Sequence, residues 1–182
     1  MMLPDRAVIL AAGLGTRLKW LTHGKPKALM NVGGVPAIVQ VIRRLAGFGI
    51  RDIAVNVHHH AGLLMDELGD GSRFGVNLFY SPEKTLLDSG GGVRTALERL
   101  PGEGPFVVHN ADVLADIDLD RLAGLCPAGG CALALVPNPA HHPAGDFALA
   151  GQQVCDSGEP RFTYAGVSVW DDAVFRSLPA NE

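Results

Sequence analysis

The sequence has no large excess of charge, no long apolar run and no regular cysteine spacing. A formal net charge of −4 over 182 residues argues against general nucleic-acid binding, which depends on a basic surface. No stretch approaches the roughly 20 apolar residues of a membrane-spanning helix, and the first apolar run is too short for a secretion signal. Cys126, Cys131 and Cys155 form no C-x-x-C motif, which favours reduced thiols and a cytoplasmic location.

Strand-like apolar runs alternate with helix-like periodic segments in the first two thirds of the chain. The predicted strands are residues 7–12, 51–58, 75–81 and 105–113, and the predicted helices are residues 36–49, 61–68 and 90–100. The alternation predicts an α/β fold, namely a Rossmann-like three-layer sandwich with a mostly parallel mixed sheet. The later pattern predicts strands at 131–137, 146–151 and 163–170, and then a helix at 171–178.

A glycine-rich turn follows the first strand, in the stretch "VILAAGLGTRLKWLTHGKPKAL". It is a poor dinucleotide-binding motif, because Leu18 stands where G-x-G-x-x-G has its third glycine. It is no P-loop either, because Pro26 follows Gly24-Lys25 where a P-loop has Ser or Thr.

The chemistry that both motifs use is nevertheless present in this turn. Gly13 and Gly15 let the backbone approach an anion closely, while Thr16 and Arg17 add donors suited to phosphate oxygens. Lysines follow downstream, Lys27 among them. The stretch predicts a phosphate-binding site, with an ordinary tight turn and a solvated basic face as the alternative.

Two further features stand at predicted strand ends, where open α/β sheets bind ligands. Residues 89–92 place three glycines at the start of a helix, either for close approach to a ligand or as a flexible cap. Asp112 follows a buried strand, where its carboxylate suits Mg²⁺ or a simple turn.

Together the segments "LAAGLGTRLKWLT…KPKAL", "LDSGGGV", "HNADV" and "TYAGVSVW" resemble the sugar-phosphate nucleotidyltransferases. The later segments most resemble the bacterial N-acetylmuramate α-1-phosphate uridylyltransferases of cell-wall recycling. The resemblance implies a GT-A-like fold, a nucleoside triphosphate (UTP) and a sugar 1-phosphate as partners, Mg²⁺ as cofactor, and a monomer or weak dimer. It implies a single domain, residues 1–182, with a nucleotide-binding half at about 1–125 and a sugar-binding half at 126–182.

The same resemblance assigns roles to individual residues. It places catalysis on Arg17, Lys27 and Asp112, and the metal on Asp112. It places the nucleotide beside Ala11, Ala12, Gly13, Gly15, Thr16, Arg17, Lys27, Gly90 and Gly91, and the sugar beside Asn110, Asp146 and Gly166.

The sequence departs from the family pattern in three places. Ala111 replaces the usual glycine, and Asp88-Ser89 replaces the commoner Glu-Thr. The family's second magnesium-binding aspartate lies in a C-terminal segment that this chain does not reach, so we expect the sugar-binding half to be incomplete. The rivals are guanylyl, thymidylyl or cytidylyl transfer to another sugar 1-phosphate, and a sensing module that binds without turnover.

The histidine run at residues 58–60 follows a predicted strand. Because alternate residues of a strand face opposite sides, three consecutive imidazoles cannot serve one metal in an extended chain. A polar loop near the nucleotide is the preferred interpretation, and a metal site the second.

Overall fold

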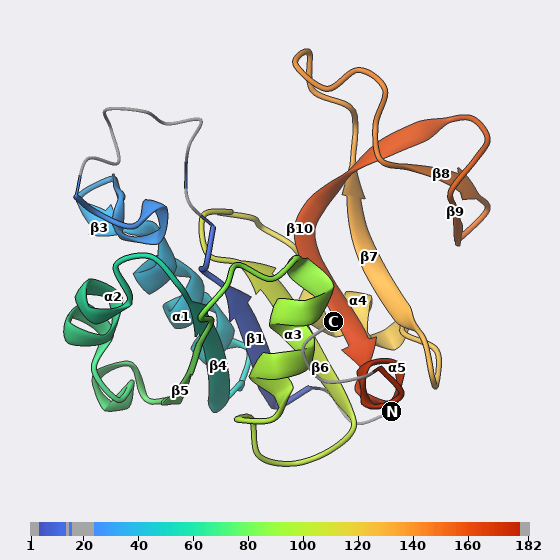
Figure 1. The fold of residues 1–182 in the computed structure, drawn as a ribbon. Coiled ribbons are helices and arrows are strands. Elements are labelled where there is room, and N and C mark those ends of the chain that lie inside the picture. Colours follow the sequence, from blue (N-terminus) through green and yellow to red (C-terminus); the bar gives the residue numbers. More distant parts are fainter. Residues whose placement is uncertain (1–3, 14, 16–23, 179–182) are drawn as a thin grey trace.

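The central element is a mixed sheet of eight strands with the order β5-β4-β1-β6-β10-β8-β9, in which β7 pairs with β10 (Figure 1). The computed structural model describes residues 4–13, 15 and 24–178. The strands are β1 (Arg6–Leu10), β4 (Asp52–Val57), β5 (Asn77–Pro82), β6 (Pro105–Asn110), β7 (Cys131–Val136), β8 (Phe147–Ala150), β9 (Gln153–Cys155) and β10 (Arg161–Asp171). The first four run parallel, and β10 is antiparallel to β6 and β7.

Both faces of the sheet are buried, because alternate residues of its parallel strands place apolar side chains on each face. Val8 pairs with Ala54 and Val108 across β4, β1 and β6, and these residues pack on one face in a common core cluster. The neighbouring Ile9 pairs with Val55, and both belong to the core of the opposite face. Continuous apolar runs of this kind are typical of parallel strands covered by helices on both sides.

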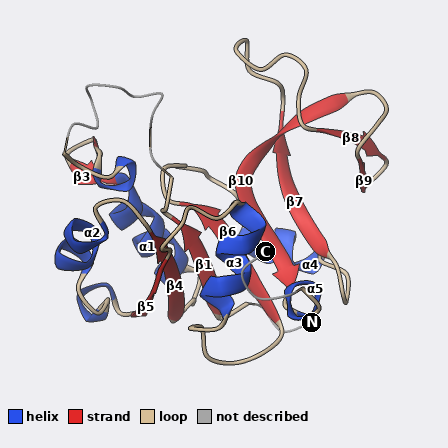
Figure 2. Cartoon of the chain, viewed as in Figure 1, coloured by secondary structure: helices blue, strands red, loops and turns tan. Residues whose placement is uncertain are grey.

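Helices cover both faces, which confirms the predicted three-layer α/β sandwich (Figure 2). The helices α1 (Ala37–Gly47), α2 (Ala61–Leu68) and α4 (Leu119–Gly124) contribute to one core, and α3 (Ser89–Leu97) and α5 (Ala173–Arg176) contribute to the other. A two-residue hairpin of β2 (Asn31–Val32) and β3 (Val35–Pro36) precedes α1, and short 3-10 turns lie at Lys27–Leu29 and Ser72–Phe74.

The second half of the chain forms an extension of the sheet. β7 and β10 project beyond the parallel strands and carry β8 and β9 at their far end (Figure 1). The pairing of β10 with β7 shifts register between Tyr164 and Ser168. A β-bulge bends its strand and re-aims side chains, and Gly166, inside this irregularity, has φ +77°.

Most predicted elements lie within a few residues of the observed ones, and three differences have physical causes. The sequence pattern missed α4, a six-residue helix too short for a clear period, although its cap is present because Asp118 accepts a hydrogen bond from the Arg121 amide (2.9 Å). It also missed β9 and the first residues of β10, whose pairing depends on distant partners. In the described part of the chain, no helix has the length and apolarity to cross a membrane.

A buried ion pair joins the start of β1 to the residues after β10. The Asp172 carboxylate accepts from Arg6 Nη2 (3.1 Å), Arg176 Nη2 (2.9 Å) and the Gly104 amide (3.0 Å). Burial alone raises the pKa of Asp172, but the bonds from Arg176, Arg6 and Gly104 together outweigh it, so the pKa lies below its ordinary value. The pair therefore holds the two ends of the described chain against one edge of the sheet.

We expect Asp172→Ala to lower the free energy of unfolding by about 3–5 kcal/mol, because Arg6, only 3% exposed, would lose its buried counter-charge. Glu103→Ala is the control, since it removes a more exposed partner of Arg176 and should cost at most about 1 kcal/mol. Urea unfolding of both variants measures the difference. Equal costs would contradict a structural role for the buried pair.

The same pair should make stability depend on acid pH. A carboxyl group whose folded pKa is lowered stabilises the fold above its unfolded pKa, about 3.9, and this contribution is lost as pH falls through the folded value. We therefore expect the unfolding free energies of the natural chain and of Asp172→Ala to converge below about pH 4.

Candidate active site

Polar residues gather at the carboxyl ends of the four parallel strands, which meet at one edge of the sheet. The glycine turn follows β1, Asn56 is the second-to-last residue of β4, Glu83 follows β5, and Asn110 ends β6. The chain segments after β1 and β6 leave the sheet at the same end (Figure 1). Open α/β sheets bind ligands at this edge.

The backbone of the glycine turn is held by a side chain of the neighbouring strand. Asn56 Oδ1 accepts hydrogen bonds from the amides of Ala11 (2.6 Å) and Ala12 (3.2 Å). Gly13 is exposed, and Gly15 has φ +63°, a conformation that favours glycine. Thr16 and Arg17, predicted to bind phosphate, lie outside the described residues.

Asn56 is in turn bound to Glu83. Asn56 Nδ2 donates to Glu83 Oε1 (2.8 Å), and Glu83 Oε2 accepts from the Leu87 amide (3.0 Å). Gly92 in α3 packs against this pair, since a Cβ there would lie 2.7 Å from Asn56 Nδ2 and 2.9 Å from Glu83 Oε1. The start of α3 therefore packs closely on the pair that holds the turn after β1, and a side chain at position 92 would have to displace Asn56 or Glu83.

The predicted glycines of residues 89–92 occupy the first turn of α3. Gly90 is exposed and Gly91 is buried. The N-cap residue Asp88 makes no side-chain cap bond, so the first amides of this helix are not satisfied by that side chain. Such amides, with the positive end of the helix dipole, favour hydrogen-bond acceptors.

Lys27 and Asp112, 85 positions apart in the sequence, form an ion pair between Nζ and Oδ2. Lys27 begins the 3-10 turn after the buried Pro26, and Asp112 follows β6. The two side chains are 40% and 29% exposed. Pairs that are this accessible to solvent contribute little to stability, so both charged groups are free to exchange partners when a charged ligand enters.

Asn110 and Gly166 are also brought together. A Cβ on Gly166 would lie 2.7 Å from Asn110 Nδ2 and 3.0 Å from Val113 Cγ2. The bulged part of β10 thus passes directly beside the end of β6. Two residues predicted to contact the sugar are therefore neighbours, although the structure does not test that role.

We expect Gly166→Ala to lower the unfolding free energy by about 1–3 kcal/mol, because alanine is strained at φ +77° and displaces Asn110. Gly75→Ala is a matched control with φ +73° and nothing within 4 Å of the added Cβ. Both variants should lose stability in urea unfolding, but only Gly166→Ala should weaken binding of a sugar 1-phosphate. Equal binding by the two variants would argue against a sugar site at Asn110.

Asp146 lies in the extension of the sheet, where its carboxylate is already bound. Its Oδ2 accepts from the Tyr164 amide (2.8 Å), and His142 Nε2 lies 3.0 Å from Oδ1. The Tyr164 bond outweighs burial and, with His142, holds the pKa of Asp146 below its ordinary value. Its side chain remains 37% exposed, so it can still contact a ligand, but its bonds to Tyr164 and His142 orient the loop before β8.

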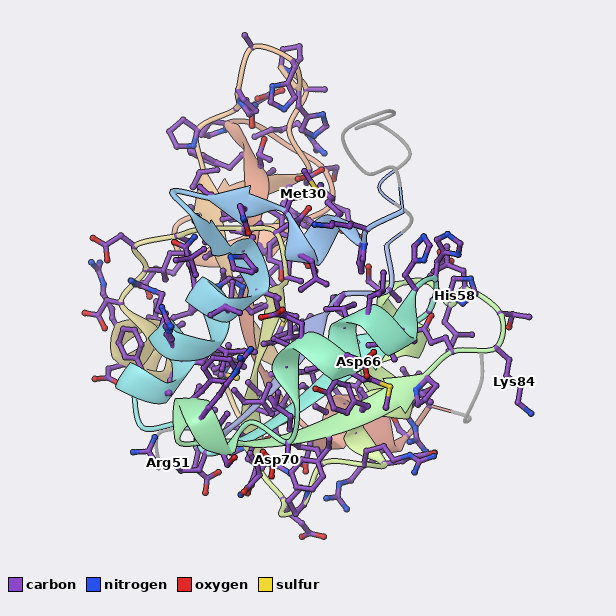
Figure 3. All side chains as sticks on the ribbon, turned by 90° about the vertical axis from the view of Figure 1, so that its left-hand side faces the viewer. Met30, Arg51, His58, Asp66, Asp70 and Lys84 are labelled. Carbon is purple, nitrogen blue, oxygen red and sulfur yellow. The ribbon has the colours of Figure 1, made fainter. Side chains whose placement is uncertain are left out.

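The histidine run after β4 has a structural contact. His58 Nδ1 donates to the Glu83 carbonyl (2.9 Å), and His58 lies at the end of β4 that faces the loop carrying Lys84 (Figure 3). The rings of His59 and His60 are 3.8 Å apart. Among the described residues, no group of three or more His, Cys, Asp or Glu side chains is arranged to hold a metal ion.

A large groove runs from this edge of the sheet along β10 and β7. Its volume is about 1540 Å³, and its polar lining includes Ser89 and Asn110, with Gly90 beside them. Most of the remaining lining is apolar, with Leu133, Leu135 and other residues of β7 to β10. Gly90 and Asn110 therefore face one space, although the sequence separates them by twenty positions.

The donors at this edge suit a hard divalent cation better than a soft one. Asp112 supplies a carboxylate, and Asn110 lies two residues before it at the end of β6. Mg²⁺ prefers oxygen ligands and is commonly held by one or two carboxylates together with substrate phosphates. Asp112 therefore fits the predicted cofactor, provided that a phosphate ligand supplies further oxygens.

Comparisons with known proteins identify the class to which this arrangement belongs. Residues 6–141 match the family model described as nucleotidyl transferase, and the chain belongs to this family of sugar-1-phosphate nucleotidyltransferases.

Individual relatives agree with that membership. The chain is 40% identical over 186 residues to the N-acetylmuramate alpha-1-phosphate uridylyltransferase of Neisseria meningitidis, covering 96% of this chain and 79% of the relative. It is 34% identical over 116 residues to a mannose-1-phosphate guanylyltransferase of Mycobacterium tuberculosis, covering 64% of this chain and 32% of that protein. The structure of HddC from Yersinia pseudotuberculosis complexed with GMP-PN has a TM-score of 0.77 at 19% identity, covering 100% of this chain and 82% of that chain, and shows the shared fold.

Proposed function

We propose that this protein transfers a uridylyl group from UTP to N-acetylmuramate α-1-phosphate, giving a nucleotide sugar and pyrophosphate for cell-wall recycling. The ion pair between Lys27, in the 3-10 turn after Pro26, and Asp112, just after β6, is the observation that carries the proposal. It combines a cation suited to phosphate with a carboxylate suited to Mg²⁺, beside a glycine turn. The 40% identity with the Neisseria uridylyltransferase supports the choice of base and sugar.

The chemistry needs no side-chain nucleophile or general base. A phosphate monoester near pH 7 is largely dianionic, since its second pKa is about 6, so an oxygen of the sugar 1-phosphate can attack the α-phosphorus directly. The new bond joins that oxygen to the α-phosphorus, the bond from the α-phosphorus to its bridging oxygen breaks, and pyrophosphate leaves with the electron pair. The barrier is the mutual repulsion of two polyanions, so the protein contributes positioning and compensating charge.

Each group of the site has a part in that compensation. Lys27 would leave Asp112 to meet the phosphates at the reacting centre, and Arg17 would contact the triphosphate. Asp112 would hold Mg²⁺, which when bound offsets the charge of the phosphates. The glycines of the turn and of α3 would let the nucleotide lie close to the backbone.

A panel of sugar 1-phosphates against the four common nucleoside triphosphates, scored by pyrophosphate release with Mg²⁺, tests the proposal. The largest kcat/KM is expected for UTP with N-acetylmuramate α-1-phosphate. A preference for GTP with mannose 1-phosphate would favour the guanylyltransferase alternative, which the mycobacterial relative supports. Triphosphate binding without release from any pair would favour the sensing module.

A further inference from the structure

Two polar side chains at the ends of β4 and β5 are buried, with Asn56 4% and Glu83 8% exposed. Burying an amide or a carboxylate is costly unless its polar atoms have partners. Asn56 uses both atoms of its amide group and Glu83 both oxygens of its carboxylate. The orientation of the Asn56 amide follows from these partners, because Oδ1 faces two N–H donors and Nδ2 faces a carboxylate.

The partners belong to two separate segments of the chain. On one side, Asn56 Oδ1 holds the amides of Ala11 and Ala12, immediately before the exposed Gly13. On the other side, Glu83 Oε2 accepts from the amide of Leu87, which immediately precedes Asp88, the N-cap residue of α3. A single buried contact of 2.8 Å between Asn56 and Glu83 therefore joins the glycine turn to the start of α3.

We propose that this Asn56–Glu83 bridge positions the nucleotide by fixing the distance between the glycine turn after β1 and the N-terminus of α3. The inference rests on the proposed function, in which those two backbone segments form opposite walls of the nucleotide site. Neither side chain is a catalytic residue, since both act through the backbone that they hold. Gly92 extends the same contact, because any Cβ there would collide with both members of the bridge.

The bridge makes a distinctive prediction because its hydrogen-bond polarity can be reversed. Asn56→Asp alone places two carboxylates against each other at 2.8 Å, and Glu83→Gln alone turns one acceptor into a donor facing either Asn56 Nδ2 or the Leu87 amide. The double substitution restores every bond. The new carboxylate at 56 accepts from Ala11, Ala12 and the new amide at 83, whose oxygen accepts from Leu87.

Titration calorimetry of these variants, with Mg²⁺–UTP and separately with a sugar 1-phosphate, tests the proposed role of the bridge. Each single variant should bind UTP roughly 10- to 100-fold more weakly, and the double variant should bind within about threefold of the natural chain. Sugar 1-phosphate affinity should change by less than about threefold throughout. Asn77→Asp is the matched control, because Asn77 makes a similar 2.8 Å contact with Asp52 between β5 and β4, but at exposed positions and at the other end of the strands.

Single variants that bind UTP normally would overturn the proposal. So would a double variant that regains its unfolding midpoint but not its UTP affinity, because the bridge would then be merely structural. Amide hydrogen exchange gives a second readout: Ala11, Ala12 and Leu87 should lose protection in both single variants and regain it in the double variant. If protection is lost only at Ala11 and Ala12, or only at Leu87, the bridge is refuted. If the natural chain binds no triphosphate, the proposed function is refuted instead.

Discussion

Lys27→Met is expected to lower kcat about 10²- to 10³-fold, with a much smaller change in KM for UTP. The negative charge around the α-phosphorus is redistributed and increases on the leaving pyrophosphate as the reaction proceeds, so a cation at this place stabilises the transition state more than the bound substrate. Nζ of Lys27 lies against Asp112 at the edge of the sheet, and methionine keeps much of the length of the side chain without its charge.

Lys25→Met is the matched control, since Lys25 is exposed and lies two residues earlier on the other side of Pro26. It should leave kcat within about threefold of the natural value, because exposed charges at a distance are screened. Steady-state kinetics of pyrophosphate release measures both variants. A raised KM with unchanged kcat in Lys27→Met would show that Lys27 binds the ground state and the transition state equally.

Asp112→Asn is expected to reduce turnover by about 10³-fold or more while leaving the fold intact. Asparagine keeps the shape but loses the charge that would hold Mg²⁺, and a misplacement of about 1 Å at a reacting centre can alone cost roughly 10²-fold. The Asp112 side chain is 29% exposed and its ion pair is accessible to solvent. The unfolding free energy should therefore change by no more than about 1 kcal/mol.

Two measurements separate the roles of Asp112. Calorimetry of UTP with and without Mg²⁺ should show a metal-dependent gain in affinity for the natural chain and little gain for Asp112→Asn. Asp116→Asn, in the same loop and with a fully exposed carboxylate paired with Arg44, serves as the control and should behave as the natural chain. An Asp112→Asn variant with normal turnover and normal metal dependence would remove Asp112 from the site.

The elements that the sequence predicted well are those determined by local apolar patterning. The continuous runs of β1, β4 and β6 and the periodic face of α1 required burial on one or both faces, and the parallel sheet followed from their alternation. The glycine turn and Asp112 were recognisable because their positions at strand ends are fixed once the strands are known. The roles assigned to these residues remain predictions.

The Asn56–Glu83 bridge was missed because it depends on the register between β1, β4 and β5. Asn56 pairs with Leu10 in β1 and Ser81 in β5, which places its side chain beneath the turn after β1. A single sequence contains one signal for it, a polar residue inside the apolar run "IAVNV". That signal shows that Asn56 needs partners, but not that Ala11, Ala12 and Glu83 supply them.

The Lys27–Asp112 contact likewise depends on tertiary structure that local sequence patterns do not reveal. The family resemblance assigned both residues to one reaction, but their proximity depends on how the chain between β1 and α1 returns to the sheet. The buried Pro26 and the 3-10 turn at Lys27–Leu29, closed by the Leu29 amide donating to the Pro26 carbonyl (2.9 Å), direct this return. The proline ring fixes φ of Pro26 itself (−60°), which restricts the path by which the chain enters this turn.

The most direct test of the account follows the α-phosphate of UTP. The purified chain is incubated with N-acetylmuramate α-1-phosphate, Mg²⁺ and UTP labelled at the α-phosphorus, and the products are separated by chromatography. The account predicts that the label appears in a nucleotide sugar, in equal amount to the pyrophosphate released, and that Lys27→Met and Asp112→Asn largely abolish its appearance. Tight binding of UTP with no transfer of label to any sugar 1-phosphate would contradict a transferase and leave a nucleotide-binding module.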